Sequence, residues 1–332
     1  MSVVDEAQLI ARMCQRVPVA PSPKGPGDDA TVEGQRVTSV DLMVEGIHMV
    51  RAHPPEWLGH KLLAVNLSDV GAMGAVPSGF LVTAALPRDV PLAWWDALSN
   101  GLGELARESG ATLLGGDVTG SPGPIVLGVT LWGHVGDAGP LLRSGGRAGD
   151  VLMLHAAQGV GRSARGLAMW LEEAHTGWGV AGSEPASGSE GGDRPVPTTS
   201  VEPCVRAHLR PETSWRLGPW AVQQGATAGM DCSDGLLMDV PRLAQQSSLK
   251  IDVDLGGLPE DLTCGAMTPE ARAAGGEDYG LLVLVPPGRR EVFESAGFVA
   301  LGHAEVGAGV VWRLDGEPVV PPEPSFVHFA GG

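Results

Sequence analysis

The chain has 332 residues and a formal net charge of −17, which comes from 39 acidic and 22 basic side chains. A protein of this length exceeds one small core and suits two packed domains. The excess of negative charge argues against nucleic acid or an anionic membrane as a partner, because either would be repelled.

The first residues predict a short helix, with Leu9, Ile10, Met13 and Val17 on one face. Acidic residues come early, and the apolar core of a secretory signal is missing. No apolar stretch approaches the roughly 18 residues that a membrane span requires. We therefore expect a cytoplasmic protein.

The cysteines and histidines show no spacing typical of a zinc site. In a cytoplasmic protein we expect four reduced thiols. They are Cys14, Cys204, Cys232 and Cys264.

The first half alternates between the patterns of strands and helices, which predicts an α/β unit that ends near Gly139. The second helix of this series begins near Pro91 and stops at Gly110. The predicted order is strand 36–44, helix 56–74, strand 79–87, helix 91–110 and strands 112–117 and 124–135.

The second half opens with a turn-rich hinge at 141–150 and is also mixed α/β. Within it, 176–203 is rich in glycine, serine and proline and is interpreted as a mobile surface insertion. We predict domains at 1–139 and 140–332, with a site between them. The predicted elements are strand 151–156, helix 163–175, structured segments at 212–225 and 227–235, a helix from Leu236 and strands 250–255 and 279–287. The half closes with the segments 291–297, 298–306 and 309–314.

Aspartates recur at or near the ends of the predicted elements, where α/β proteins gather ligands. Asp29 follows a Gly-Pro-Gly turn, and Asp69 lies inside an apolar helical pattern without a basic residue one turn away. A partly buried carboxylate needs a partner from elsewhere in the fold. Carboxylates that cannot neutralise one another indicate a divalent cation, and hard oxygen ligands favour Mg²⁺. The remaining members of this set are Asp41, Asp117, Asp231 and Asp234.

Mg²⁺ held by few carboxylates usually accompanies phosphates. Two glycine-rich turns, 113–120 and 143–150, offer backbone N–H groups that could approach a phosphate closely. Arg143 and Arg147 supply guanidinium donors, and Ser233 supplies a hydroxyl between two acids.

Known nucleotide motifs are scarce. The P-loop pattern GxxxxGK[ST] is absent. A G-x-G-x-x-A match runs from Gly159 to Ala164, between a predicted strand and a helix. It keeps a nicotinamide-dependent oxidoreductase as an alternative, although no second strand ending in an acid follows about 20 residues later.

The order of the motifs resembles the thiamine-monophosphate kinase family over nearly the whole chain. The motifs are "GPGDDA", "SVDLMVEGIHM", "KLLAVNLSDVGAMGA", "GGDVTG", "RSGGRAGD", "HLRP", "DCSDGL" and "GGEDYGLL". The resemblance implies an aminoimidazole ribonucleotide synthetase-like α/β fold and a homodimer whose N-terminal sheets form a shared barrel. It also implies transfer of phosphate from ATP to thiamine monophosphate, with several Mg²⁺ ions and ATP in a cleft between domains.

Motif by motif, the resemblance also implies site residues. The metal set would be Asp29, Ser39, Val40 through its carbonyl, Asp41, Asp69, Asp117, Asp231 and Asp234, with Asp41, Asp69 and Asp117 assisting the transfer. The ATP contacts would be Gly116, Asp117, Arg143 and Ser233. The thiamine side would be His48, Glu277, Phe326 and Phe329.

Three alternatives stay open beside this reading. One is another ATP-dependent synthetase of the same superfamily, although Cys14 sits in a predicted helix rather than in a reactive glycine-rich loop. The others are the oxidoreductase that would use Gly159–Ala164, and a nucleotide-binding protein without catalysis.

Overall fold

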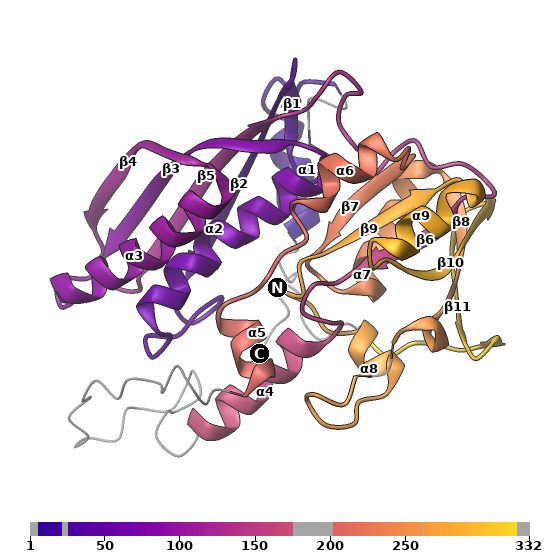
Figure 1. Ribbon diagram of the computed structural model, residues 1–332. Helices are drawn as coiled ribbons and strands as arrows, with labels where there is room; N and C mark the ends of the chain where they lie inside the picture. The colour runs from indigo at the N-terminus through magenta and orange to yellow at the C-terminus, as the bar shows by residue number, and fades with distance from the viewer. Residues whose placement is uncertain (1–5, 22–25, 175–201, 260, 324–332) are drawn as a thin grey trace.

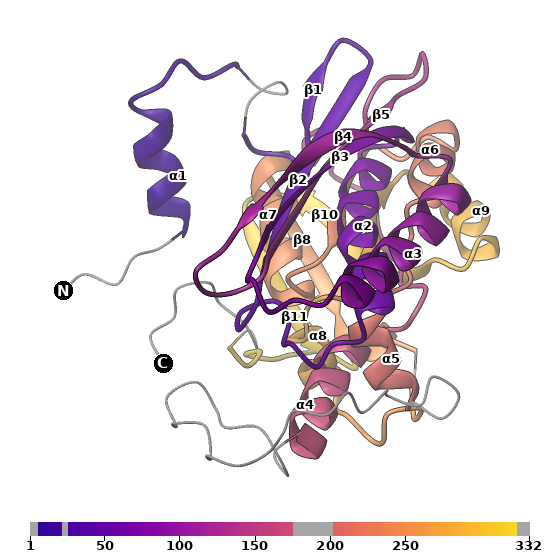
Figure 2. The same cartoon turned by 90° about the vertical axis from the view of Figure 1, so that its left-hand side faces the viewer.

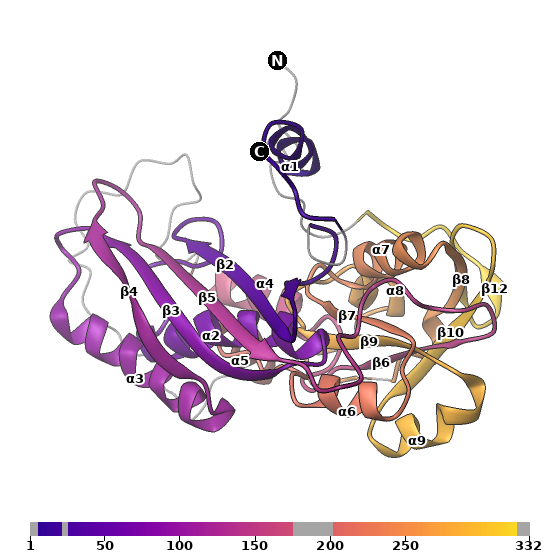
Figure 3. The same cartoon turned by 90° about the horizontal axis from the view of Figure 1, so that it is seen from above.

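Two β-sheets organise the protein, and the strands of the first all precede residue 135 while those of the second all follow residue 150. The computed structural model describes residues 6–21, 26–174, 202–259 and 261–323. The ribbon places the first sheet with its helices on one side and the second sheet on the other (Figure 1). Seen from above, the two lie side by side (Figure 3).

The first sheet has five strands in the order β1-β2-β5-β3-β4. All neighbours are antiparallel except β3 and β4, which run parallel. The strands are β1 (Thr31–Glu33), β2 (Arg36–Val44), β3 (Val76–Leu86), β4 (Thr112–Gly120) and β5 (Val126–His134). The strands predicted at 36–44, 79–87, 112–117 and 124–135 are confirmed.

Helices α2 (Pro55–Ala72) and α3 (Leu92–Ser109) cover one face of this sheet (Figure 2). They cross closely because glycines face backbone at the crossing. A Cβ at Gly101 would lie 1.7 Å from the carbonyl oxygen of Glu56, and one at Gly59 would lie 1.9 Å from that of Leu98. Gly110 ends α3 in the left-handed conformation, as the sequence predicts.

Helix α1 (Glu6–Cys14) lies on the other side of the first sheet, away from the body of the molecule (Figures 2 and 3). The predicted N-terminal helix is therefore confirmed. Its apolar side chains are exposed within this chain, with exposed fractions of 47% for Leu9 and 59% for Met13.

The second sheet has seven strands in the order β12-β11-β8-β10-β6-β9-β7. β9 lies inside it with every residue buried, which agrees with its unbroken apolar sequence. The strands are β6 (Val151–His155), β7 (Ala228–Cys232), β8 (Leu249–Asp254), β9 (Gly280–Val285), β10 (Val299–Val306), β11 (Gly309–Leu314) and β12 (Glu317–Pro318).

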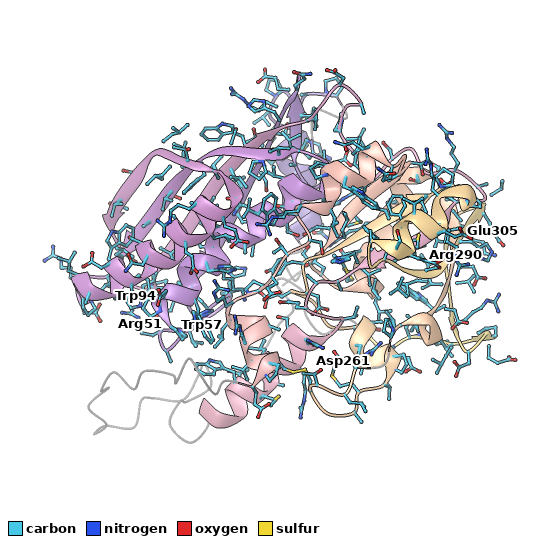
Figure 4. All side chains as sticks on the ribbon, in the orientation of Figure 1. Arg51, Trp57, Trp94, Asp261, Arg290 and Glu305 are labelled. Atoms are coloured by element: carbon cyan, nitrogen blue, oxygen red, sulfur yellow. A yellow bond between two sulfur atoms is a disulfide. The ribbon has the colours of Figure 1, made fainter. Side chains whose placement is uncertain are left out.

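Helices of the second half surround this sheet and also reach toward the first half. Trp57 on α2 packs against Val205 and Leu209 of α5, and it is labelled in Figure 4. The helices are α4 (Arg162–Ala174), α5 (Pro203–Leu209), α6 (Leu217–Gln223), α7 (Leu236–Ser247), α8 (Pro269–Ala273) and α9 (Arg290–Ser295), with 3₁₀ turns at Leu255–Gly257 and Pro287–Arg289. Nearly all of the predicted insertion at 176–203 lies outside the described residues.

One prediction about the cysteines is wrong. Cys204 at the start of α5 forms a disulfide with Cys264 in the loop before α8, and their Cα atoms are 5.9 Å apart. Cys14 and Cys232 are free thiols, as expected. The bonded pair is 60 residues apart in the sequence, so no local spacing could reveal it. None of the helices in the described parts of the chain combines the length and the apolar character needed to cross a bilayer.

Candidate active site

Four aspartates from separate elements gather between the two sheets. Asp41 lies on β2, Asp69 on α2, Asp231 on β7, and Asp29 on the segment that precedes β1. Helix α2 brings Asp69 there because it is buried over almost its whole length and packs between the first sheet and β7. The charges of Asp41, Asp231 and Asp29 all act on the Asp69 carboxyl.

Hydroxyl and amide groups hold these carboxylates in place. The Ser39 hydroxyl donates to Asp69 Oδ2 at 2.5 Å, and this is the partner from elsewhere in the fold that Asp69 needed. The Ser68 hydroxyl donates to Asp231 Oδ2 at 3.1 Å, and the Asp231 amide donates to Asp29 Oδ2 at 3.3 Å. The last bond ties the N-terminal segment to the second sheet.

Arg143 forms an ion pair with this cluster. Its Nε lies 3.0 Å from Asp29 Oδ1, and its terminal NH2 group is closer still. Its backbone amide donates to Asp28 Oδ1 at 2.6 Å. Asp28 thus binds the backbone of Arg143, whereas Asp29 binds its guanidinium group. Burial alone would lower the pKa of Arg143, but Asp29 outweighs that effect and raises it.

One arginine cannot neutralise four carboxylates, and the pKa values of Asp69 and Asp41 are raised. Burial, and then repulsion from Asp41, Asp231 and Asp29, raise the pKa of Asp69 well above its ordinary value. Burial also raises the pKa of Asp41, although a hydrogen bond with Asp69 lowers it in part. The Asp41 Oδ2 atom is buried without a hydrogen-bond partner. Such a group calls for a ligand or a proton.

The donor chemistry of this cluster fits Mg²⁺. Its atoms are carboxylate and hydroxyl oxygens, which are the hard ligands that this ion prefers, and one of them is buried and unpartnered. Across the described residues, no three His, Cys, Asp or Glu side chains already stand in a metal-holding arrangement. The carboxylates therefore lie near one another, but their oxygen atoms are not yet arranged to coordinate a metal ion.

The structure does not bring Asp117 into this cluster within one chain. Along the sheet, Asp41 is level with Val129, Val82 and Gly116, three strands across. Three strand spacings amount to about 14 Å. Asp117 is one residue further along β4, level with Thr83, so it points to the opposite face of the sheet from Asp41.

The side chains of two other residues in the expected metal set have different surroundings. The Val40 side chain is 71% exposed on the outer face of β2, so only its backbone could contribute to the cluster. Asp234 forms an ion pair with Arg242, which also binds Asp239 at 2.8 Å. Sequence reasoning missed Arg242 as the partner of Asp234, because a basic residue on an amphipathic helix such as α7 resembles any solvated charge.

The residues expected at the nucleotide have clear local roles. A Cβ at Gly116 would lie 1.9 Å from the Val82 carbonyl oxygen, so close strand pairing alone requires glycine there. Ser233 lies 3.4 Å from Asp231 Oδ1, beside the carboxylate cluster. In the turn 143–150, the Gly146 amide already donates to the Ser247 hydroxyl at 3.2 Å.

On the thiamine side, Glu277 is bound by two residues that sequence reasoning missed. Lys61 Nζ lies 3.1 Å from Glu277 Oε1, and His208 Nδ1 lies 2.9 Å from Oε2. The signal for Lys61 was its position as the one lysine or arginine in a mostly apolar helix. His48 lies in the turn after β2, where its Nδ1 accepts from the Val44 amide at 3.1 Å. Phe326 and Phe329 lie outside the described residues.

In the glycine motif at 159–164, a side chain of the protein already accepts hydrogen bonds from the backbone amides. Asp278 accepts hydrogen bonds from the amides of Gly161 at 2.5 Å and Ser163 at 3.2 Å. These N–H groups begin α4, and a bound pyrophosphate would use them in a dinucleotide site. The carboxylate therefore fills the position that the oxidoreductase alternative requires.

Comparison with known proteins identifies relatives along almost the whole chain. The family model "AIR synthase related protein, N-terminal domain" matches residues 27–135. The thiamine-monophosphate kinase of Escherichia coli (strain K12) is 32% identical, with 98% of each chain covered. That of Mycobacterium tuberculosis is also 32% identical, covering 89% of this chain and 86% of the relative. The solved structure of AaThiL complexed with AMPPCP and TMP superposes with a TM-score of 0.78 at 27% identity, covering 96% of this chain and 97% of that one.

Proposed function

This chain belongs to the thiamine-monophosphate kinase family, and we propose that it transfers the γ-phosphoryl group of ATP to thiamine monophosphate. The products are thiamine diphosphate and ADP, so the enzyme is a phosphotransferase whose acceptor is a phosphate group. The observation that carries the proposal is the convergence of Asp29, Asp41, Asp69 and Asp231 beside Arg143.

We assign the metal ligands to the oxygen-rich cluster and its neighbours. Bound Mg²⁺ would offset the repulsion between two anionic reactants and orient both. Buried Asp41 Oδ2 is the strongest support for this assignment, because it has no other partner in the described structure. The proposed ligands are Asp29, Ser39, the Val40 carbonyl, Asp41, Asp69, Asp117, Asp231 and Asp234.

The remaining residues bind and orient the reactants. The acceptor phosphate has a second pKa of about 6, so it is an anion near neutral pH and needs no strong general base. Attack on the γ-phosphorus is therefore in line and direct, without a covalent enzyme intermediate. We assign the ATP contacts to Gly116, Asp117, Arg143 and Ser233, and the thiamine contacts to His48, Glu277, Phe326 and Phe329.

We propose that the protein works as a homodimer formed through the first sheet. The outer face of this sheet carries exposed apolar side chains: Val40 at 71%, Leu42 at 55%, Leu81 at 37% and Leu114 at 62%. Within the described residues, no further strand pairs with the edge strands β1 and β4. A second copy would cover this face and join the two sheets into a barrel. Asp117 points to the same face, which supports a role for it in a site completed by the second copy.

We place the domain boundary between 139 and 140, where the chain leaves the first sheet. A cytoplasmic location goes with the proposed reaction, since ATP is found there. Disulfides such as Cys204–Cys264 are uncommon in that reducing compartment. Measuring whether this bond is oxidised in cells therefore tests the proposed location.

A coupled ADP-release assay tests the function. We expect ADP release with thiamine monophosphate and Mg²⁺, with thiamine diphosphate formed in equal amount. Thiamine and formylglycinamidine ribonucleotide serve as competing acceptors. Turnover with the ribonucleotide alone would favour another synthetase of the superfamily, and nucleotide binding without ADP release would indicate a protein without catalysis.

A further inference from the structure

A fully buried lysine connects the two halves of the molecule. Lys61 on α2 has no exposed surface, and it lies among the apolar residues of that helix, such as Leu58 and Leu62. A buried ammonium group destabilises the fold unless it is paired. Its Nζ lies 3.1 Å from Oε1 and 3.2 Å from Oε2 of Glu277, a residue 216 positions later in the chain.

His208 on α5 holds the same carboxylate from a second direction. Its Nδ1 lies 2.9 Å from Glu277 Oε2, and its side chain is only 7% exposed. Burial, and then the charge of Lys61, lower the pKa of His208, although Glu277 opposes them. The same Nδ1 atom also lies 3.2 Å from the Ser163 hydroxyl, so the ring is held between Glu277 and the start of α4.

The Glu277 backbone is fixed as firmly as its side chain. Glu277 has φ of +62° and Tyr279 has φ of +50°, and such left-handed conformations are strained for residues other than glycine. The Glu277 amide donates to the Ser233 carbonyl at 2.6 Å, and the Gln158 side chain donates to the Glu277 carbonyl at 3.3 Å. These bonds hold a strained turn in one conformation.

The Glu277 side chain keeps some contact with solvent, and its Oε1 atom also lies 3.5 Å from the Tyr279 hydroxyl. The Glu277 side chain is 33% exposed, whereas that of Lys61 is completely buried. Burial raises the pKa of Glu277, but Lys61 and His208 outweigh that effect and hold it below its ordinary value. Apolar side chains of similar volume often stabilise a fold as well as a buried ion pair does. The contacts of Lys61 and His208 are therefore better explained by the orientation of the Glu277 carboxylate than by a contribution to stability alone.

We propose that Lys61 and His208 are positioning residues that hold the Glu277 carboxylate directed at the cationic thiazolium ring of thiamine monophosphate. This inference rests on the proposed function. Neither residue touches the substrate in this scheme, and each acts only through Glu277. Loss of either partner lets the carboxylate rotate or take up a proton, so the site loses its fixed negative charge toward the substrate cation.

The test compares Lys61→Met, His208→Leu and Glu277→Gln with wild type. We expect the KM for thiamine monophosphate to rise tenfold or more in each variant, with the KM for ATP unchanged and kcat within about threefold. His208→Asn, whose amide can still donate near the Nδ1 position, should recover most of the loss. Arg313→Met is the matched control, because it breaks the Arg313–Asp252 pair on the second sheet and should leave all kinetic constants unchanged.

A double variant separates positioning from a merely structural role. If Lys61 acts through Glu277, then Lys61→Met combined with Glu277→Gln should have the same KM for thiamine monophosphate as Glu277→Gln alone. Additive effects, or equal losses in both KM values, would overturn the inference. If Lys61→Met does not fold, the contrast between His208→Leu and His208→Asn decides, because equal KM values in those two variants would also overturn it.

Direct binding distinguishes this failure from failure of the proposed function. Thiamine carries the same ring cation without a phosphate, so its binding can be measured calorimetrically without ATP or Mg²⁺. We expect Lys61→Met to weaken it at least tenfold. An active wild type with unchanged thiamine binding in the variant would sink the inference alone, whereas a wild type without thiamine-monophosphate-dependent ADP release would sink the proposed function.

Discussion

Replacing Asp69 with asparagine should make the metal-free protein more stable and at the same time inactive. The Asp69 carboxyl lies among three other carboxylates, and Asp41 is within hydrogen-bonding reach of it. Without a cation these groups repel one another, and an amide at position 69 removes that repulsion. The amide oxygen can still accept the hydrogen bond from Ser39.

The size of the effect follows from Coulomb's law. Two carboxylates about 4 Å apart repel by roughly 4 kcal/mol at an effective dielectric constant of about 20. Proton uptake by the folded protein already relieves part of this, so we expect the free energy of unfolding to rise by about 2 kcal/mol. An unfolding entropy of about 2.1 cal/mol/K per residue gives about 0.7 kcal/mol/K for this chain, and hence a Tm rise of about 3 °C.

The assay is thermal unfolding of wild type and Asp69→Asn, first in EDTA and then with increasing MgCl₂. Wild type should gain stability as Mg²⁺ is added, because the ion binds the folded state. The variant should start higher, gain less and lose turnover by a factor of 100 or more. Asp89→Asn, at a side chain that is 76% exposed, is the control and should change none of these. A variant that melts below wild type in EDTA, or gains as much from Mg²⁺, would refute the electrostatic reasoning.

Three further outcomes test other parts of the structure. Gly101→Ala should lower the free energy of unfolding by about 3 kcal/mol or more, measured in urea, because its Cβ would lie 1.7 Å from a carbonyl oxygen of α2. Gly103→Ala on the same helix, with a nearest neighbour at 3.4 Å on a flexible side chain, should be neutral or stabilising. Reducing Cys204–Cys264 should cost about 4 kcal/mol for its 60-residue separation, and equal urea midpoints with and without reductant would contradict this. Burial raises the pKa of Asp278 to about 7, so protons favour the folded state. Relative to Asp278→Asn, wild type should lose roughly 1.4 kcal/mol of stability per pH unit between about 4 and 7, and parallel pH profiles would refute the shift.

Local sequence determined most of the secondary structure. Helix α3 begins after Pro91 and ends at Gly110, and β2 occupies the predicted residues 36–44, because proline, glycine and side-chain periodicity act over a few neighbours. The sequence also singled out Asp69, since a carboxylate inside an apolar helix cannot be left without a partner.

Only the tertiary structure decided which distant residues meet. Lys61 pairs with Glu277 across 216 positions, Cys204 bonds Cys264, and Asp278 caps the helix that a sequence motif had offered to a cofactor. The same register that brings Asp41 toward Asp69 turns Asp117 to the other face of the sheet. Such pairings depend on how strands are ordered and helices cross, and those choices reflect packing of the whole core rather than the preferences of any short segment.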